Sequence, residues 1–78
     1  MTVQERLEEI FRGVLNREDI ALTDETTAAD VPGWDSVAQI NLMVSIEQSF
    51  GVQFTGNQLA EFRNVGELRR FLEGRAGV

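Results

Sequence analysis

Apolar residues recur every three or four positions along most of this chain, and no stretch of useful length alternates apolar and polar residues. The spacing predicts an amphipathic helix over residues 2–16 and a second over 36–50. It also predicts a short third element over 57–62 and a fourth helix that begins at Asn64. Because each helix must bury its apolar face against the others, we predict an all-α fold. The expected architecture is a four-helix bundle of three main helices and one short helix, with a long first loop.

The length and two missing residue types limit what the chain can do. Its 78 residues suit a single domain over residues 1–78 and leave no room for a second core. The chain contains neither cysteine nor histidine. These absences exclude disulfides, zinc sites built from Cys or His, and a catalytic dyad with His as the base. A hydrolytic enzyme is therefore a remote alternative, and we predict that the chain is not an enzyme.

The charge balance is acidic, with thirteen acids against seven arginines and a net charge of −6. Such a chain repels nucleic acid and anionic lipid surfaces and attracts basic patches on protein partners. No apolar run approaches the length of a membrane span, and the first residues do not read as a signal peptide. We therefore expect no nucleic-acid partner, no membrane insertion, a cytoplasmic location and, by default, a monomer. The loop acids Asp24, Glu25 and Asp30 lack the spacing of a calcium loop, so no metal site is predicted.

The second helix has the widest apolar face and is predicted to occupy the centre of the bundle. The residues assigned to that face are Val37, Ile40, Met43, Val44, Ile46 and Phe50. Leu42 falls outside this face. The side chains expected to be exposed are Ala38, Asn41, Ser45 and Gln48.

An irregular connection over residues 17–35 leads into this helix. Connections of this length without a regular pattern are uncommon in compact domains and are usually functional. We expect Ile20, Leu22 and Val31 to hold it against the core. The dipeptide Pro32-Gly33 predicts a tight turn that delivers the chain to the start of the second helix.

Asp35 and Ser36 stand at that start. Asp35 is placed to cap the helix by accepting from an amide one turn inside it. Ser36 then takes the first helical position, where the free amides and the helix dipole favour an anion. A phosphodiester formed on the Ser36 hydroxyl would be electrostatically favoured there. An Asp-Ser pair is also a common helix cap without any further role, so the residues alone leave a modification site and a plain cap both open.

The run Gly33–Leu42 (GWDSVAQINL), continued by residues 46–47 (IE) and 50–52 (FGV), resembles the signature of acyl carrier proteins. The resemblance covers nearly the whole chain. It implies a four-helix fold and a 4′-phosphopantetheine arm that a phosphopantetheinyl transferase moves from coenzyme A onto Ser36. The terminal thiol of the arm would hold acyl or related cargo as a thioester. This reading accounts for the missing cysteine, since the working thiol is imported.

The chain departs from the family pattern at the attachment helix. Val37 follows the serine where the family usually has leucine, and Glu47 is the single acid between Ser36 and Phe50. Steering of basic partners to this helix should therefore be weak, which favours a dedicated carrier in a specialised lipid, polyketide or other secondary pathway. The residues expected to bind partners are Trp34, Val37, Ala38, Asn41 and Glu47.

Several alternatives stay open at this point. The expected partners are the transferase, an acyl-loading or adenylating enzyme, and a downstream synthase or transferase. Within carriers, the alternatives are a primary fatty-acid-synthesis carrier and an aminoacyl or peptidyl carrier. Outside carriers, the alternative is an acidic helical interaction module that is never modified. The resemblance also implies that Met43, Val44 and Ile46 could line a cavity for tethered cargo, but for each of these residues an ordinary core position is the favoured interpretation.

Overall fold

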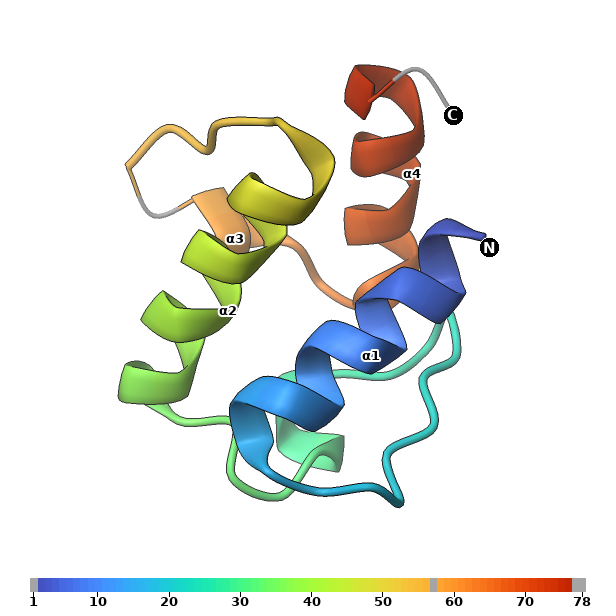
Figure 1. Cartoon of the computed structure of the whole chain (residues 1–78), viewed down its shortest axis with the longest axis vertical. Coiled ribbons are helices and arrows are strands. Elements are labelled where there is room, and N and C mark those ends of the chain that lie inside the picture. The colour runs from blue at the N-terminus through green and yellow to red at the C-terminus, as the bar shows by residue number, and fades with distance from the viewer. Residues whose placement is uncertain (1, 57, 77–78) are drawn as a thin grey trace.

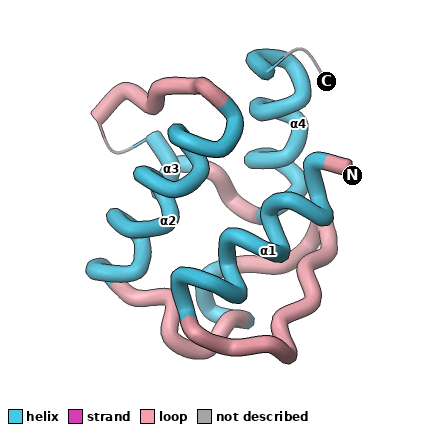
Figure 2. The backbone as a smooth tube through the Cα atoms, in the orientation of Figure 1, coloured by secondary structure: helices cyan, strands magenta, loops and turns pink. Residues whose placement is uncertain are grey.

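The computed structural model describes residues 2–56 and 58–76. In chain order its helices are α1 (Val3–Leu15), the short 3-10 helix η1 (Ala28–Asp30), α2 (Ser36–Phe50), α3 (Gln58–Glu61) and α4 (Val65–Ala76). Helices and loops account for both described ranges, with no β-strand in either (Figure 2). The predicted all-α fold is confirmed, including the three main helices and the short one. Asn57, the expected start of the third element, lies outside the described residues.

Side-chain caps explain where the helices begin. Thr2 Oγ1 accepts from the amide of Glu5 at 3.1 Å, and Glu5 Oε1 accepts from the amide of Thr2 at 2.8 Å, which is a complete capping box at the start of α1. Asn64 Oδ1 accepts from the amide of Glu67 at 3.0 Å and thereby caps the start of α4. At the far end of α2, Gly51 adopts a left-handed conformation with φ +68° and stops the helix.

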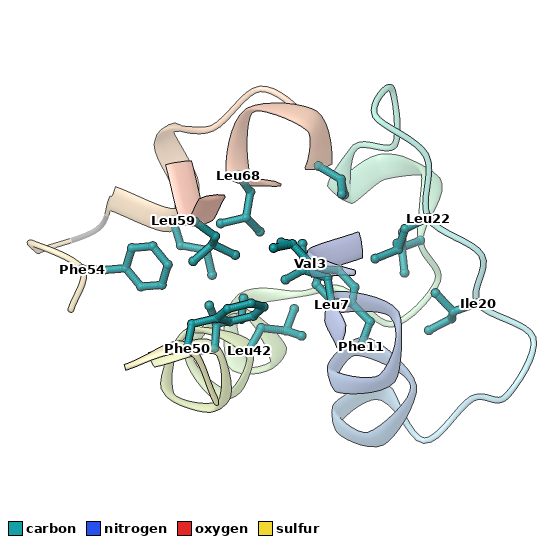
Figure 3. Packing of buried hydrophobic residues seen from close by; sticks show 14 residues of the cluster. Val3, Leu7, Phe11, Ile20, Leu22, Leu42, Phe50, Phe54, Leu59 and Leu68 are labelled. Atoms are coloured by element: carbon teal, nitrogen blue, oxygen red, sulfur yellow. The ribbon is translucent and has the colours of Figure 1, made fainter. Parts of the chain in front are cut away.

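The core lies between α1, α2 and α4. Helix α1 packs against both α2 and α4, while α3 packs on α2 (Figure 1). Leu7 and Phe11 of α1 are fully buried, as are Leu42 and Ile46 of α2 (Figure 3 labels the first three of these). Leu72 of α4 is equally inaccessible. One apolar cluster therefore joins all three main helices.

The orientation of α2 differs from the sequence prediction. Its buried stripe consists of Ala38, Leu42, Ile46 and Phe50, which follow one another at intervals of four. Leu42, which was predicted to fall outside the apolar face, is 0% exposed, and Ala38, which was predicted to be exposed, is 8% exposed. The predicted core residues Val37, Ile40 and Val44 are 69%, 59% and 43% exposed. Apolar residues surround most of this helix, so periodicity could not choose between two faces. The buried stripe is the one that meets α1.

The long first loop is held on the helices at both ends. Ile20, Leu22 and Val31 are buried in the core, as predicted. The carbonyl of Ile20 accepts from Arg12 Nε at 2.9 Å, and the amide of Leu22 donates to Glu8 Oε2 at 2.8 Å, so the first half of the loop lies along α1.

The second half of the loop lies against the start of α4. The amide of Val65 donates to the carbonyl of Thr26, and the amide of Gly66 donates to the carbonyl of Asp24, both at 2.9 Å. These bonds use amides at the start of α4 that have no partner within the helix. The loop is therefore held against α1 and α4 by these hydrogen bonds before it leads into α2.

Candidate functional site

The turn before α2 sets the position of Ser36. Gly33 has φ +90°, a conformation that glycine adopts without strain, and the amide of Trp34 donates to the carbonyl of Val31 at 3.2 Å. Asp35 is extended, and its Oδ1 accepts from the amide of Ala38 at 2.9 Å. The predicted cap is therefore confirmed. Ser36 is the first residue of α2 and is exposed, so its hydroxyl stands where the helix dipole favours an anion.

Trp34 fastens this turn to the body of the protein. Its indole ring meets the ring of Phe11 edge-on, with the centroids 4.9 Å apart and the planes at 86°. The indole Nε1–H donates to Gln39 Oε1 in the first turn of α2. Trp34 is half-buried, so part of the ring also stays accessible beside Ser36. These contacts make the turn a rigid support rather than a free loop.

A cavity of about 590 Å³ opens beside the attachment helix. Ser36, Gln39 and Ile40 form the α2 side of this cavity. Across from them the lining residues are Leu59, Ala60, Phe62, Arg63, Asn64, Val65 and Leu68, and the loop contributes Thr27 and Ala28. Cavities of this volume are large enough for a small organic ligand. The exposed hydroxyl and the adjoining cavity fit an arm that is tethered at Ser36.

The cavity does not use the residues that the resemblance implied. Met43, Val44 and Ile46 are absent from its lining, because Ile46 faces the core and Val44 faces outward. Leu59 and Phe62 line the cavity, but they are not among the site residues predicted from the sequence. Nothing local in the sequence connects them with Ser36, since only the packing of α3 on α2 brings them to the same cavity.

The remaining residues expected to bind partners fall into two groups. Val37 and Asn41 are exposed on α2 and are free to meet another protein. Ala38 is buried, so its expected exposure is wrong and its side chain offers little surface to a partner. Glu47 is half-buried, and its Oε2 accepts from the amide of Phe54 at 2.7 Å, which gives its carboxylate a structural role in fixing the chain after α2.

Comparison with protein families matches residues 5–72 to the phosphopantetheine attachment site family. The chain belongs to this family. It is 26% identical over 73 residues to the acyl carrier protein of Helicobacter pylori, with 94% of each chain covered. The solution structure of the holo acyl carrier protein of Geobacter metallireducens superposes with a TM-score of 0.87 and 35% identity, covering 99% of this chain and 88% of the other.

These comparisons make the chain an acyl carrier protein that takes phosphopantetheine covalently and that is not an enzyme. This membership favours a carrier over the open alternative of an acidic module that is never modified. Within residues 2–56 and 58–76, no helix combines the length and the apolar character needed to cross a bilayer.

Proposed function

We propose that Ser36 is the residue that receives the phosphopantetheine arm, and that the chain is a dedicated carrier for one set of partner enzymes. The assignment of Ser36 rests on one observation. Its exposed hydroxyl stands at the first position of α2, where Ser36 also lines the cavity. Ser45 and Ser49 lie inside α2 and are only half-exposed, and the Ser49 hydroxyl is engaged by Arg6 at 3.0 Å. Neither offers an open approach to a transferase.

The attachment reaction needs little from the carrier itself. Ser36 Oγ forms a new P–O bond to the pantetheine-side phosphorus of coenzyme A. The bond from that phosphorus to the bridging oxygen breaks, adenosine bisphosphate leaves, and the hydroxyl proton passes to the transferase. Asp35 holds the first turn of α2 in place, and the free amides of that turn favour the charge of the new phosphodiester. Once bound, the arm supplies the thiol that holds cargo as a thioester.

We further propose that the cavity shelters part of the tethered cargo. Its lining is mainly apolar, with Ile40, Leu59 and Leu68 among the side chains, and it starts at Ser36 itself. Burial of apolar cargo there would be favourable by about 25 cal/mol per Å² and would limit the access of water to the thioester.

The dedicated character of the carrier is proposed from its attachment helix. A carrier that serves many basic enzymes benefits from acids beside the serine, because opposite charges accelerate encounter. Here Asp35 precedes the serine and Glu47 is the one acid of α2, while most of the other acids lie on α1 and in the first loop. We place the chain in a specialised lipid, polyketide or other secondary pathway, with an acyl-loading or adenylating enzyme and a downstream synthase as partners. A cytoplasmic location stays a prediction.

The attachment is tested by intact mass after incubation of the apo protein with coenzyme A and a broad-specificity phosphopantetheinyl transferase. The wild type and the control Ser45→Ala should each gain one phosphopantetheine unit, and Ser36→Ala should gain none. A wild type that gains no mass, or a Ser36→Ala variant that gains the same mass, would refute the assignment. The holo form is then offered to candidate loading enzymes. Efficient loading by the general fatty-acid or by an aminoacyl-adenylating system would contradict the dedicated lipid or polyketide role.

A further inference from the structure

The hydrogen bond between Trp34 and Gln39 bridges the attachment serine. Trp34 stands two positions before Ser36 and Gln39 three positions after it, and all three residues line the cavity. We infer that Gln39 is a positioning residue for the phosphopantetheine arm. Its side-chain NH2 group donates to the phosphodiester on Ser36 and thereby turns the arm towards the cavity. The inference rests on the proposed attachment at Ser36 and goes beyond it by naming the residue that directs the arm.

The chemistry of the two side chains fixes which way the Gln39 amide points. The indole Nε1–H of Trp34 can donate but cannot accept, so its partner has to be the amide oxygen, and the bond runs to Gln39 Oε1. The donor end of the same amide, Nε2, therefore points away from the indole nitrogen. This end carries two protons and can serve a further acceptor.

Trp34 and Gln39 are held in place by the protein itself. The Trp34 ring meets the ring of Phe11 edge-on, with the centroids 4.9 Å apart, and Phe11 is fully buried in the core. The backbone amide of Gln39 donates to the carbonyl of Asp35 at 2.8 Å. The Gln39 side chain is thus oriented by a fixed ring and a fixed backbone, so little conformational entropy is lost when it meets the arm.

Gln39 lies one helical turn from Ser36. Residues three positions apart on a helix have Cβ atoms about 5–6 Å apart, and a phosphodiester on Ser36 Oγ extends beyond its Cβ, so the glutamine side chain can reach it. Hydrogen bonds to ionised acceptors are stronger than those between neutral groups. Val37, which is 69% exposed, is about 200° around α2 from Gln39. An arm held by Gln39 therefore leaves Ser36 on the side of the cavity.

The other polar side chains of the cavity are less suited to this role. The Thr27 hydroxyl donates to a carboxylate at 3.1 Å, and Asn64 Oδ1 is engaged as the cap of α4. Asp35 carries a negative charge and would repel the phosphodiester. Arg63 is a cation, but its side chain is 87% exposed and lies 3.9 Å from Glu67. Exposed ion pairs of this kind contribute little, so Gln39 is the better placed donor.

NMR of the apo and holo forms tests the contact directly. Holo protein is made to completion with coenzyme A and the broad-specificity transferase, and its mass is verified. Between the two forms, the side-chain NH2 signal of Gln39 should shift several-fold more than that of Gln48, which is exposed further along α2. Trp34→Phe keeps an aromatic ring and removes the N–H. The Gln39 shift should be smaller in this variant, because the amide is no longer oriented.

Three substitutions that each lower the net charge by one test the effect on the arm. Each variant is loaded from butyryl coenzyme A by the same transferase, and hydroxylamine cleavage of the thioester at neutral pH is followed by intact mass. Gln39→Glu keeps the acceptor for Trp34 and replaces the donor with a negative charge. Its thioester should be cleaved about three- to ten-fold faster than that of the wild type, because the arm spends less time in the cavity. Gln48→Glu and Arg63→Gln should match the wild type.

A Gln39 shift no larger than that of Gln48 would overturn the inference, as would equal cleavage rates for Gln39→Glu and Gln48→Glu. A larger effect of Arg63→Gln than of Gln39→Glu would assign the phosphodiester to the cation instead, and would overturn it too. The shift comparison in the wild type needs no variant, so it decides even where a substitution prevents folding. Failure of the proposed function looks different, since the wild type would then gain no mass.

Discussion

Arg69 and Asp24, which are 45 positions apart, form a two-pronged ion pair that fastens the first loop to α4. The guanidinium donates from Nε to Oδ1 and from Nη2 to Oδ2, both at 3.0 Å. Paired bonds of this kind fix the orientation of both groups. A few residues further along the same loop, Thr27 and Ala28 line the cavity beside Ser36. The ion pair therefore helps to hold one wall of the candidate site in place.

Loss of this ion pair should lower stability in a way that depends on pH. The hydrogen bond from Arg69 holds the pKa of Asp24 below its ordinary value of 3.8. Because the folded-state pKa is the lower one, the stabilisation is fully present above the unfolded pKa and is lost as the pH falls through the folded pKa. Asp24→Asn should therefore lower Tm at neutral pH by on the order of a few degrees, since the pair is partly exposed.

Thermal unfolding followed by circular dichroism checks this expectation. The difference in Tm between wild type and Asp24→Asn should shrink below about pH 4. Asp19→Asn is the matched control, because Asp19 pairs with Arg17 only two positions away and joins no distant segments. Its Tm should stay close to that of the wild type. A difference for Asp24→Asn that persists undiminished at about pH 2 would show that the ion pair is not its cause.

The glycine at the start of α4 is required by the same loop. A Cβ added at Gly66 would lie 2.9 Å from both the Cβ and the carbonyl oxygen of Asp24. The obstruction includes backbone, so it cannot be relieved by a side-chain rotation. Gly66→Ala should cost about 1–3 kcal/mol in the free energy of unfolding. Gly74→Ala, in the same helix with nothing within 4 Å, should instead stabilise by about 0.5–1 kcal/mol.

Urea unfolding of the two alanine variants measures this contrast directly. Both substitutions give the same gain in helix propensity, so the difference between them isolates the contact with Asp24. Equal stabilisation by the two would mean that the loop can withdraw from α4 without cost.

Local chemistry allowed much of this fold to be predicted from the sequence. The cap at Asp35 is confirmed, and like the caps at Thr2 and Asn64 it joins a side chain to an amide three positions along the chain, which a sequence pattern can reveal. The glycine stop at Gly51 is equally local. The loop residues Ile20 and Leu22 were recognisable as core residues because they are apolar in an otherwise polar stretch.

Which side of α2 faces the core, and which residues line the cavity, depend instead on tertiary packing. Apolar residues lie on both sides of this helix, so the choice between Leu42 and Ile40 as a core residue is made by α1. The opposite wall of the cavity comes from Leu59 and Leu68, more than twenty positions beyond Ser36. No pattern within α2 could indicate them. The same error placed Val37, Ile40 and Val44 in the core, although all three are exposed.

Two identical substitutions on α2 should separate its buried and exposed faces. Ile46→Val removes one methylene from a fully buried side chain and should cost about 0.5–1.5 kcal/mol. Ile40→Val makes the same chemical change at an exposed position and should alter stability by less than about 0.5 kcal/mol. Helix propensity is matched, because both residues are β-branched. Chemical denaturation gives both values. Comparable costs at the two positions would restore the orientation predicted from the sequence, in which both side chains face the core.

The last prediction separates the cap from the charge of Asp35. Its Oδ1 accepts from the amide of Ala38 at 2.9 Å, and asparagine can keep this bond while losing the charge. Asp35→Ala should therefore lower the free energy of unfolding by about 1 kcal/mol, and Asp35→Asn should cost well under half of that. If Asp35 serves Ser36 by holding the first turn of α2, Asp35→Asn should be modified by the transferase at close to the wild-type rate, while Asp35→Ala should be slower. Stability from urea unfolding and the initial rate from intact mass are measured on the same samples. An Asp35→Asn variant that is as stable as the wild type but as slow as Asp35→Ala would instead assign the carboxylate a direct role towards the transferase.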